Sequence, residues 1–277
     1  MVDKNRVSGA HESETADQVP ASWRDERGLS DLVGFVLAFF VILASVGFVS
    51  TFGVDVLEDV RNSQQENNAE QAFNVMAKNF DEIEQAQAPS RTAEIDLRDG
   101  DLSVRNTTKV TIEVTHDNTG SFETAVYPRQ IRLQPNPTDS TVLLYENGAT
   151  IRGTNRTSQG IVDNPPTMSC SEDQAIVSIV QLNTSTDRQL GSGTVRITGS
   201  ENRTSLVYPV NRTGQNSSTN VTDLHLSFES EFNTAWVSYL TKSSDDGWEK
   251  VSDTEVRCHD IERVFVRETE INVQFVR

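Results

Sequence analysis

Apolar residues are concentrated in one uninterrupted block near the N-terminus, from Leu32 to Val54, which contains no charged side chain. Asp31 and Asp55 bracket the block, so its ends are sharp. A helix that crosses the hydrocarbon core of a bilayer needs about 20 mostly apolar residues, and soluble helices rarely lack a polar face. The block therefore predicts a transmembrane helix over residues 29–54, with the lipid bilayer as its partner, rather than a buried core helix.

The helical period continues beyond this block in an amphipathic form. Apolar residues recur there at three- and four-residue spacing, namely at Ala69, Ala72, Phe73, Met76, Phe80 and Ile83. The stretch 62–68 is almost wholly polar, and we expect the helix to fray or kink in it. We predict an amphipathic stalk helix over residues 55–92 whose apolar stripe docks on the following domain.

From Ala93 onward the pattern changes to the alternation that is typical of β-strands. We predict strands at 95–97, 102–104, 110–114, 142–145, 150–152, 175–182, 194–198, 205–210 and 223–228, and a final hairpin of 263–267 and 270–276. Asn147-Gly148 between two of these strands is a strong hairpin signal. Phe232, Trp236, Tyr239 and Leu240 have helical spacing. The fold class is therefore α+β, with the long N-terminal transmembrane and stalk helix followed by a β-rich, sandwich-like extracellular head over residues 93–277.

The distribution of charge predicts the orientation of the chain in the membrane and argues against a nucleic-acid partner. The net charge is −17 and the pI is about 4.6, so we expect no nucleic-acid partner, because phosphate binding needs clustered Lys and Arg. The preference for Arg over Lys in an acidic chain fits a halophilic protein. In the leader, residues 1–28, Arg24 and Arg27 directly precede the apolar block, and Asp55, Glu58 and Asp59 follow it. This charge bias predicts a single-pass protein of the cell membrane. Its N-terminus is expected in the cytoplasm and its C-terminal domain outside the cell.

Signatures of catalysis and of cofactor binding are missing from the sequence. It contains no Gly-x-Ser-x-Gly, no P-loop, no His-Glu-x-x-His and no Gly-x-Gly-x-x-Gly, so we predict neither an enzyme nor a cofactor. Two alternatives for a reactive site are a nucleophile or a metal site formed by Cys258 and His259, with Cys170 as a partner. Adjacent residues of a strand point to opposite faces, which favours a Cys170–Cys258 disulfide in an extracellular domain. We likewise read the aspartates of residues 96–101 as an acidic turn rather than a Ca²⁺ site.

Sequons for N-glycosylation, Asn-x-Ser/Thr, are confined to the part of the chain after the stalk. They are centred on Asn106, Asn155, Asn183, Asn202, Asn211, Asn216 and Asn220. Several sequons are expected by chance in a chain rich in Thr, Ser and Asn. We therefore expect a minority to be glycosylated on an exposed surface.

The junction between leader and apolar block reads Arg27-Gly28-Leu29-Ser30-Asp31. A short polar leader that ends in a basic residue and glycine, followed at once by an apolar helix, resembles the class III signal peptide of haloarchaeal type IV pilins and archaellins. The resemblance covers residues 24–90. It implies that a prepilin peptidase cuts between Gly28 and Leu29, with Arg27 as the basic determinant. Ser30 is then placed to cap the helix that begins after it.

The resemblance also implies a function. In that family the freed apolar helix is the assembly surface for other pilin-like subunits. We therefore predict a pilin-like cell-surface subunit, a minor pilin or pseudopilin of an archaeal type IV pilus-like system, with an extracellular head for assembly or adhesion. Bacterial pilins carry Glu at the fifth mature position, where this chain has Val33. The alternative is a single-pass, membrane-anchored surface glycoprotein that does not polymerise, and a secreted enzyme on a stalk comes third.

Overall fold

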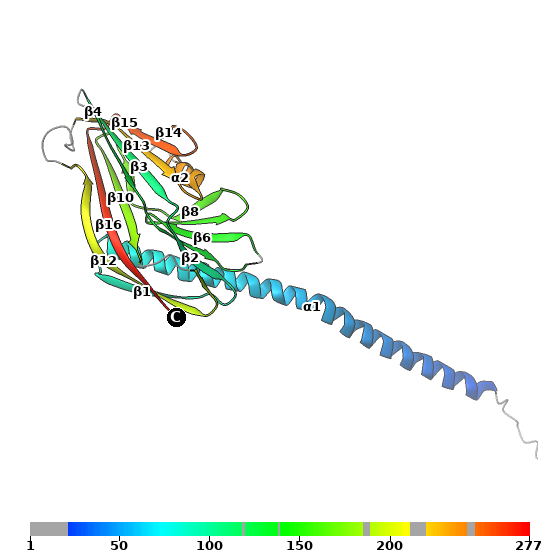
Figure 1. Ribbon diagram of the computed structural model, residues 1–277. Coiled ribbons are helices and arrows are strands. Elements are labelled where there is room, and N and C mark those ends of the chain that lie inside the picture. Colours follow the sequence, from blue (N-terminus) through cyan, green and yellow to red (C-terminus); the bar gives the residue numbers. More distant parts are fainter. Residues whose placement is uncertain (1–21, 118–119, 138, 185–188, 211–219, 243–246) are drawn as a thin grey trace, which may run out of the picture. The chain divides into compact units, whose positions relative to one another are not determined.

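The structure is a computed structural model that describes the backbone of residues 22–117, 120–137, 139–184, 189–210, 220–242 and 247–277. Side chains are described for the same residues apart from 22–29, 52–56 and 58–59. The chain divides into two compact units, residues 1–60 and 61–277. Each unit is described by itself, with the elements labelled as in Figure 1.

Helix α1 runs from Ser22 to Glu84 and contributes to both units. The expectation that the helix begins after Ser30 is wrong. Arg and Glu in the leader are good helix formers, and a Gly inside a helix costs only about 1 kcal/mol. The polar stretch 62–68 also stays helical, since it contains neither Gly nor Pro. The helix ends before Ala86, which takes a positive φ of 56°.

Within the second unit, one face of α1 is buried against the β-strands. The buried face is the stripe that the spacing predicted, with Ala77 added: Ala69, Phe73, Met76, Ala77, Phe80 and Ile83, none more than 4% exposed. Ala72 is half-buried at the border of this face. Near its start, Gln65 Nε2 donates a hydrogen bond to the carbonyl oxygen of Pro135 at 2.9 Å. From Gln65 onward, one face of the helix is therefore part of the core of the β-rich unit.

The first sheet has five strands in the order β1-β12-β16-β10-β9. Its strands are β1 (Ser90–Asp96), β9 (Met168–Cys170), β10 (Gln174–Asn183), β12 (Thr194–Tyr208) and β16 (Arg263–Val276). The strand latest in the sequence, β16, lies at the centre, antiparallel to β12 and parallel to β10. Figure 1 shows β1, β12, β16 and β10 side by side.

Two further sheets complete the β-rich unit. The second sheet has the order β11-β2-β5-β6-β7-β8, with β2 (Asp101–Arg105), β5 (Gln130–Gln134), β6 (Thr141–Glu146), β7 (Ala149–Thr154), β8 (Gly160–Asn164) and β11 (Gln189–Gly191). The third has the order β14-β15-β13-β3-β4, with β3 (Lys109–His116), β4 (Gly120–Val126), β13 (Val221–Glu229), β14 (Trp248–Lys250) and β15 (Glu255–His259). Where a sandwich-like head was expected, the described residues form three sheets.

Two predictions made from local sequence concern the short helix near Trp236 and the hairpin at Asn147-Gly148. The short helix α2 spans Asn233–Leu240, and Phe232, which we expected inside it, is its N-cap. Asn147 and Gly148 join β6 to β7 with φ angles of 49° and 81°. Two consecutive positive φ angles are the requirement of a type I′ turn, so the predicted Asn-Gly hairpin is confirmed.

The apolar side chains form two clusters. The first core lies among the third sheet, α2 and part of the first and second sheets, and includes Tyr208, Phe228 and Trp236. The second core holds the buried stripe of α1 against the first and second sheets. Strands β10 and β16 supply residues to both cores, so these two strands are shared by the two cores.

The long strand β16 corrects the prediction of a final hairpin. Val264 and Val266 belong to the first core, whereas Ile271 and Val273 belong to the second. Successive residues of a strand point to opposite faces, so the change from even to odd positions means that opposite faces of the sheet are buried at its two ends. The polar residues between Val266 and Ile271 therefore lie within one continuous strand and not in a turn. Strand β12 is likewise one continuous strand, where we expected two strands, 194–198 and 205–210.

Candidate functional site

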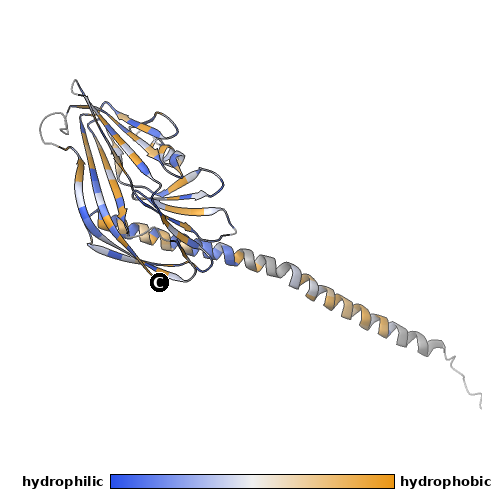
Figure 2. Ribbon diagram, in the orientation of Figure 1, coloured by the Kyte–Doolittle hydropathy of each residue, from blue (hydrophilic) through white to orange (hydrophobic). Residues whose placement is uncertain are grey.

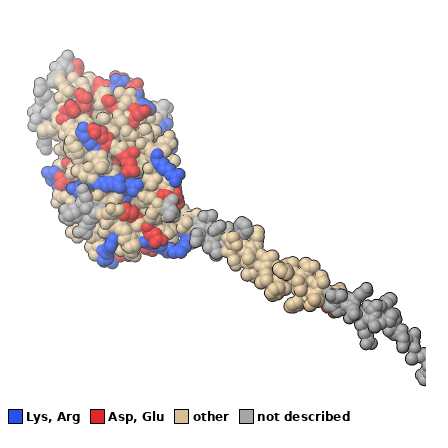
Figure 3. Space-filling model, turned by 45° about the vertical axis from the view of Figure 1, so that its right-hand side comes forward, with Lys and Arg blue, Asp and Glu red and all other residues tan. Residues whose placement is uncertain are grey.

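The apolar part of α1, Ser30–Thr51, has 22 residues, a mean hydropathy of 2.8, and no buried residue in its most apolar window. In Figures 2 and 3 this segment is hydrophobic and carries no Lys or Arg. Its hydroxyl groups bond to the preceding turn of the helix: Ser45 Oγ donates to the Val41 carbonyl, and Thr51 Oγ1 donates to the Gly47 carbonyl at 2.8 Å. The segment is long and apolar enough to serve as a membrane anchor or as a signal sequence.

The predicted processing site lies just before this segment. The backbone of Arg27, Gly28 and Leu29 is helical and belongs to α1. Their side chains lie outside the described residues. Ser30 falls inside the helix rather than at its cap, so the capping role assigned to Ser30 is wrong.

Cys170 and Cys258 are joined by a disulfide with an S–S distance of 1.97 Å and a Cα–Cα distance of 5.9 Å. Cys258 ends up fully buried, and His259 points outward to Asp260, whose Oδ2 lies 2.8 Å from His259 Nδ1. The bridge ties β9 to β15 across 88 positions of sequence. The chain-entropy model assigns about 4–5 kcal/mol of stabilisation to a disulfide that closes a loop of this size.

Among the described residues, no group of three or more His, Cys, Asp or Glu is arranged to hold a metal ion.

The asparagines of five of the seven sequons lie in the described part of the chain and are exposed: Asn106, Asn155, Asn183, Asn202 and Asn220. Asn211 and Asn216 lie outside the described residues. On the face shown in Figure 3, acidic and basic side chains of the β-rich unit are interspersed. A solvated surface of this kind is compatible with attached sugars.

The described sequons differ in how their reactive groups are engaged. Asn202 Nδ2 donates to Glu270 at 2.8 Å, and Asn183 Nδ2 donates to Asn272 at 3.1 Å. The hydroxyl of Thr108, which completes the sequon of Asn106, is buried. Asn155, Arg156 and Thr157 are all exposed in the turn between β7 and β8. Thr222, which completes the sequon of Asn220, is half-buried and donates its hydroxyl proton to the Thr115 carbonyl oxygen at 3.3 Å. Asn155 is therefore the most accessible of these sequons in the folded domain.

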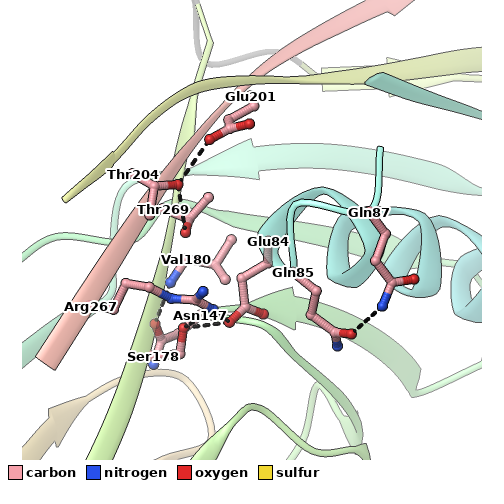
Figure 4. A network of polar contacts seen from close by, with 10 residues as sticks. All are labelled: Glu84, Gln85, Gln87, Asn147, Ser178, Val180, Glu201, Thr204, Arg267 and Thr269. Carbon is pink, nitrogen blue, oxygen red and sulfur yellow. Dashed lines mark hydrogen bonds and ion pairs between the residues drawn. The ribbon is translucent and has the colours of Figure 1, made fainter. Parts of the chain in front are cut away.

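An ion pair between a buried Glu and a half-buried Arg fastens the last turn of α1 to the first sheet, as Figure 4 shows. Glu84 is 3% exposed, and its Oε1 lies 2.8 Å from Arg267 Nη2 of β16. Ser178 of β10 donates its hydroxyl proton to the same carboxylate oxygen. Removing Arg267 would leave the buried charge of Glu84 without its partner. This cluster therefore fixes where the helix ends on the sheet.

A second carboxyl group of the same helix, that of Asp81, has a raised pKa. It lines a surface hollow and accepts a hydrogen bond from Asn164 Nδ2 at 2.9 Å. Burial, with a smaller contribution from the charge of Glu84, raises the pKa of Asp81 to about 6. The buried hydroxyl of Tyr145 has no hydrogen-bond partner within the described part of the chain, and burial raises its pKa as well.

Glu146 is the most enclosed carboxylate among the described residues, and no sequence pattern pointed to it. It is fully buried and accepts hydrogen bonds from Thr108 Oγ1 at 2.6 Å, Ser230 Oγ at 2.5 Å and Trp236 Nε1 at 2.5 Å. Burial raises the pKa of Glu146, although the three hydrogen bonds oppose the shift. The donors come from three distant segments, and only their spatial convergence identifies this site.

An apolar helix able to cross a membrane, joined to a disulfide-bonded β-rich domain, defines the class of protein. The chain belongs to a family of unknown function (DUF7289), whose family model matches residues 27–274. The matched region begins at Arg27 and therefore includes the predicted processing site. No curated protein and no solved structure matches the chain.

Proposed function

We propose that this protein is a pilin-like cell-surface subunit, a minor pilin or pseudopilin, that is cut by a prepilin peptidase between Gly28 and Leu29. The observation that carries the proposal is the junction itself. Arg27-Gly28 directly precedes an apolar segment that is exposed on all sides and is available for membrane or subunit contacts. A cut at this point removes the polar leader and retains the helix as an assembly surface.

The other half of α1 supports the same proposal. The stripe from Ala69 to Ile83 is packed into the second core, so this half of the helix is committed to the β-rich unit. The first half is not buried by any described residue of the chain. One half of the helix is thus packed against the β-rich unit, and the other half is exposed. We expect this arrangement in a subunit whose exposed helix packs against other subunits.

The proposed orientation puts the leader in the cytoplasm and the head outside. Arg24 and Arg27 lie before the apolar segment, and the acidic residues Asp55, Glu58 and Asp59 lie after it. The Cys170–Cys258 disulfide supports an oxidising location for the head. The head is then the part that meets assembly partners or an adhesion target.

The second candidate is a single-pass, membrane-anchored surface glycoprotein that does not polymerise. Two observations favour it: Val33 occupies the fifth position after the proposed cut, and the head is larger than those that major pilins carry. The two candidates differ in whether the leader is removed.

The N-terminal residue of the protein isolated from its native membranes tests the proposal. We expect Leu29 in the wild type, and retention of the leader in Gly28→Val because the added side chain crowds the scissile bond. Gly34→Val is the matched control, since nothing lies within 4 Å of a Cβ at Gly34, and it should be processed normally. A wild-type protein that keeps Met1 contradicts the proposal and leaves the non-polymerising anchor.

A further inference from the structure

Three polar side chains from separate segments meet in the interior of the β-rich unit. Thr108 directly precedes β3, Gln130 begins β5 and Glu146 ends β6. They are 2%, 1% and 0% exposed. Thr108 Oγ1 lies 2.6 Å from Glu146 Oε2 and 3.4 Å from Gln130 Oε1. A hydroxyl, a carboxamide and a carboxylate are therefore held together away from solvent.

We propose that these three residues form an intramolecular ester cross-link between Thr108 and Gln130. The Thr108 Oγ1 attacks the Gln130 Cδ. The Oγ1–H and Cδ–Nε2 bonds break, the Oγ1–Cδ bond forms, and ammonia leaves. Glu146 accepts the hydroxyl proton and delivers it to the departing nitrogen, so the carboxylate is regenerated and no further reactant is needed.

The hydrogen bonds around Glu146 suit the role of a general base. A hydroxyl has one proton, and the shorter contact of Thr108 places that proton on Glu146 Oε2, which leaves the oxygen lone pairs free to face Gln130. Trp236 Nε1 and Ser230 Oγ both donate to the other carboxylate oxygen, Oε1. They hold the carboxylate in place while Oε2 serves Thr108. The raised pKa of Glu146, caused by burial, makes it a better proton acceptor than an exposed carboxylate.

The surroundings also suit the product. An ester between residues that are almost unexposed is protected from water. A surface hollow lined by Thr107, Ser230 and Glu231 adjoins the triad and offers a way out for ammonia. The bond would join the start of β3 in the third sheet to the start of β5 in the second sheet, which no hydrogen-bonded ladder connects. The inference is independent of the proposed pilin-like function.

Intact-mass measurement of the full-length protein, purified in detergent from a host that does not N-glycosylate, tests this proposal. We expect the wild type to be about 17 Da lighter than its disulfide-bonded sequence mass, the loss that the release of ammonia requires. Trypsin should release residues 106–109 joined to residues 130–132, and hydroxylamine should separate the pair. A succinimide at Asn147-Gly148 loses the same mass, so the joined peptides are the decisive species.

Variants assign the roles. Thr108→Val removes the nucleophile and Glu146→Gln removes the base, and both should abolish the joined peptides. Thr107→Val is the matched control, because Thr107 is the exposed neighbour, and it should retain them. A wild-type protein at its full sequence mass, with no joined peptides, overturns the proposal. Joined peptides that persist in Glu146→Gln overturn the assignment of Glu146 as the base.

Discussion

The ring of Phe80 on α1 rests directly on the backbone of Gly199 in β12. A Cβ placed on Gly199 would lie 2.6 Å from Phe80 Cε1 and 3.1 Å from Ile83 Cδ1, which is closer than real side-chain contacts allow. The same ring also meets Tyr145 in a T-shaped contact with centroids 5.2 Å apart. The position of the helix on the sheet therefore depends on the absence of one methyl group.

Gly199→Ala should destabilise the β-rich unit. The new methyl group would force Phe80 and Ile83 out of place, and overpacking of this kind costs about 1–3 kcal/mol. Thermal unfolding followed by circular dichroism should show a lower Tm. Gly191→Ala is the control, because the nearest atom to its Cβ is 3.9 Å away. Equal Tm values for the two variants would mean that α1 does not rest on Gly199 in solution.

Two truncations test whether α1 is part of the domain. A protein that starts at Gln64 keeps Gln65 and the buried stripe, and we expect it to be soluble, monomeric and folded. A protein that starts at Pro89 keeps β1 and loses the helix, so the second core is exposed and the product should aggregate and bind hydrophobic dyes. Size-exclusion chromatography compares the two. Identical elution of both as monomers would contradict the packing described for α1.

Asp81 should make stability depend on pH. A carboxyl whose folded-state pKa is raised from 3.8 to about 6 stabilises the fold fully only below its ordinary pKa, and this contribution is lost as the pH rises through about 6. Asp81→Asn keeps an acceptor for Asn164 and removes the charge. We expect it to raise the free energy of unfolding by about 1 kcal/mol near pH 8, after allowance for partial exposure, and to change it little near pH 4.

Denaturant unfolding at the two pH values measures this effect. Asp99→Asn, in an exposed turn of the same unit, is the control and should change stability little at both. An Asp81→Asn variant with the same stability gain at both pH values would show that charge is not the cause.

Glycosylation should favour the sequon in the β7–β8 turn. If sugars are added after the domain folds, Asn155 should carry them more often than Asn183 or Asn202, because the amide nitrogens of the latter two are hydrogen-bonded in the sheet. Glycopeptide mass spectrometry of protein from its native cells gives the occupancy of each site. Asn155→Gln should remove the modified species, and Asn202→Gln should not. Higher occupancy at Asn202 than at Asn155 would contradict this expectation.

The parts of the fold that the sequence predicts are those set by local periodicity. The stripe of α1 and the Asn147-Gly148 turn each depend on residues close together in the chain. Strand β16 was misread because its buried face changes from even to odd positions midway, as Val266 and Ile271 show. That change makes sense only when two cores are known to lie on opposite faces of one sheet, and no local pattern contains this information.

The same limit applies to the candidate sites. The Cys170–Cys258 pair was foreseeable because the chain contains only two cysteines. The cluster around Glu146 was not, because Thr108, Ser230 and Trp236 are 38, 84 and 90 positions away from it. Long-range convergence of ordinary polar residues leaves no spacing to recognise.

The central place of β16 in the first sheet has a consequence for biogenesis. Both neighbours of β16, β10 and β12, are synthesised before it, and β10 pairs with it at positions about ninety residues apart, as in Gln174 with Arg263. The sheet cannot close until the ribosome has delivered the segment up to Val276. Until then the chain lacks its middle strand and stays open, which is the state in which an unfolded polypeptide can thread through a membrane. In the orientation proposed above, the sheet would be completed after translocation, in a compartment where the cysteines can oxidise.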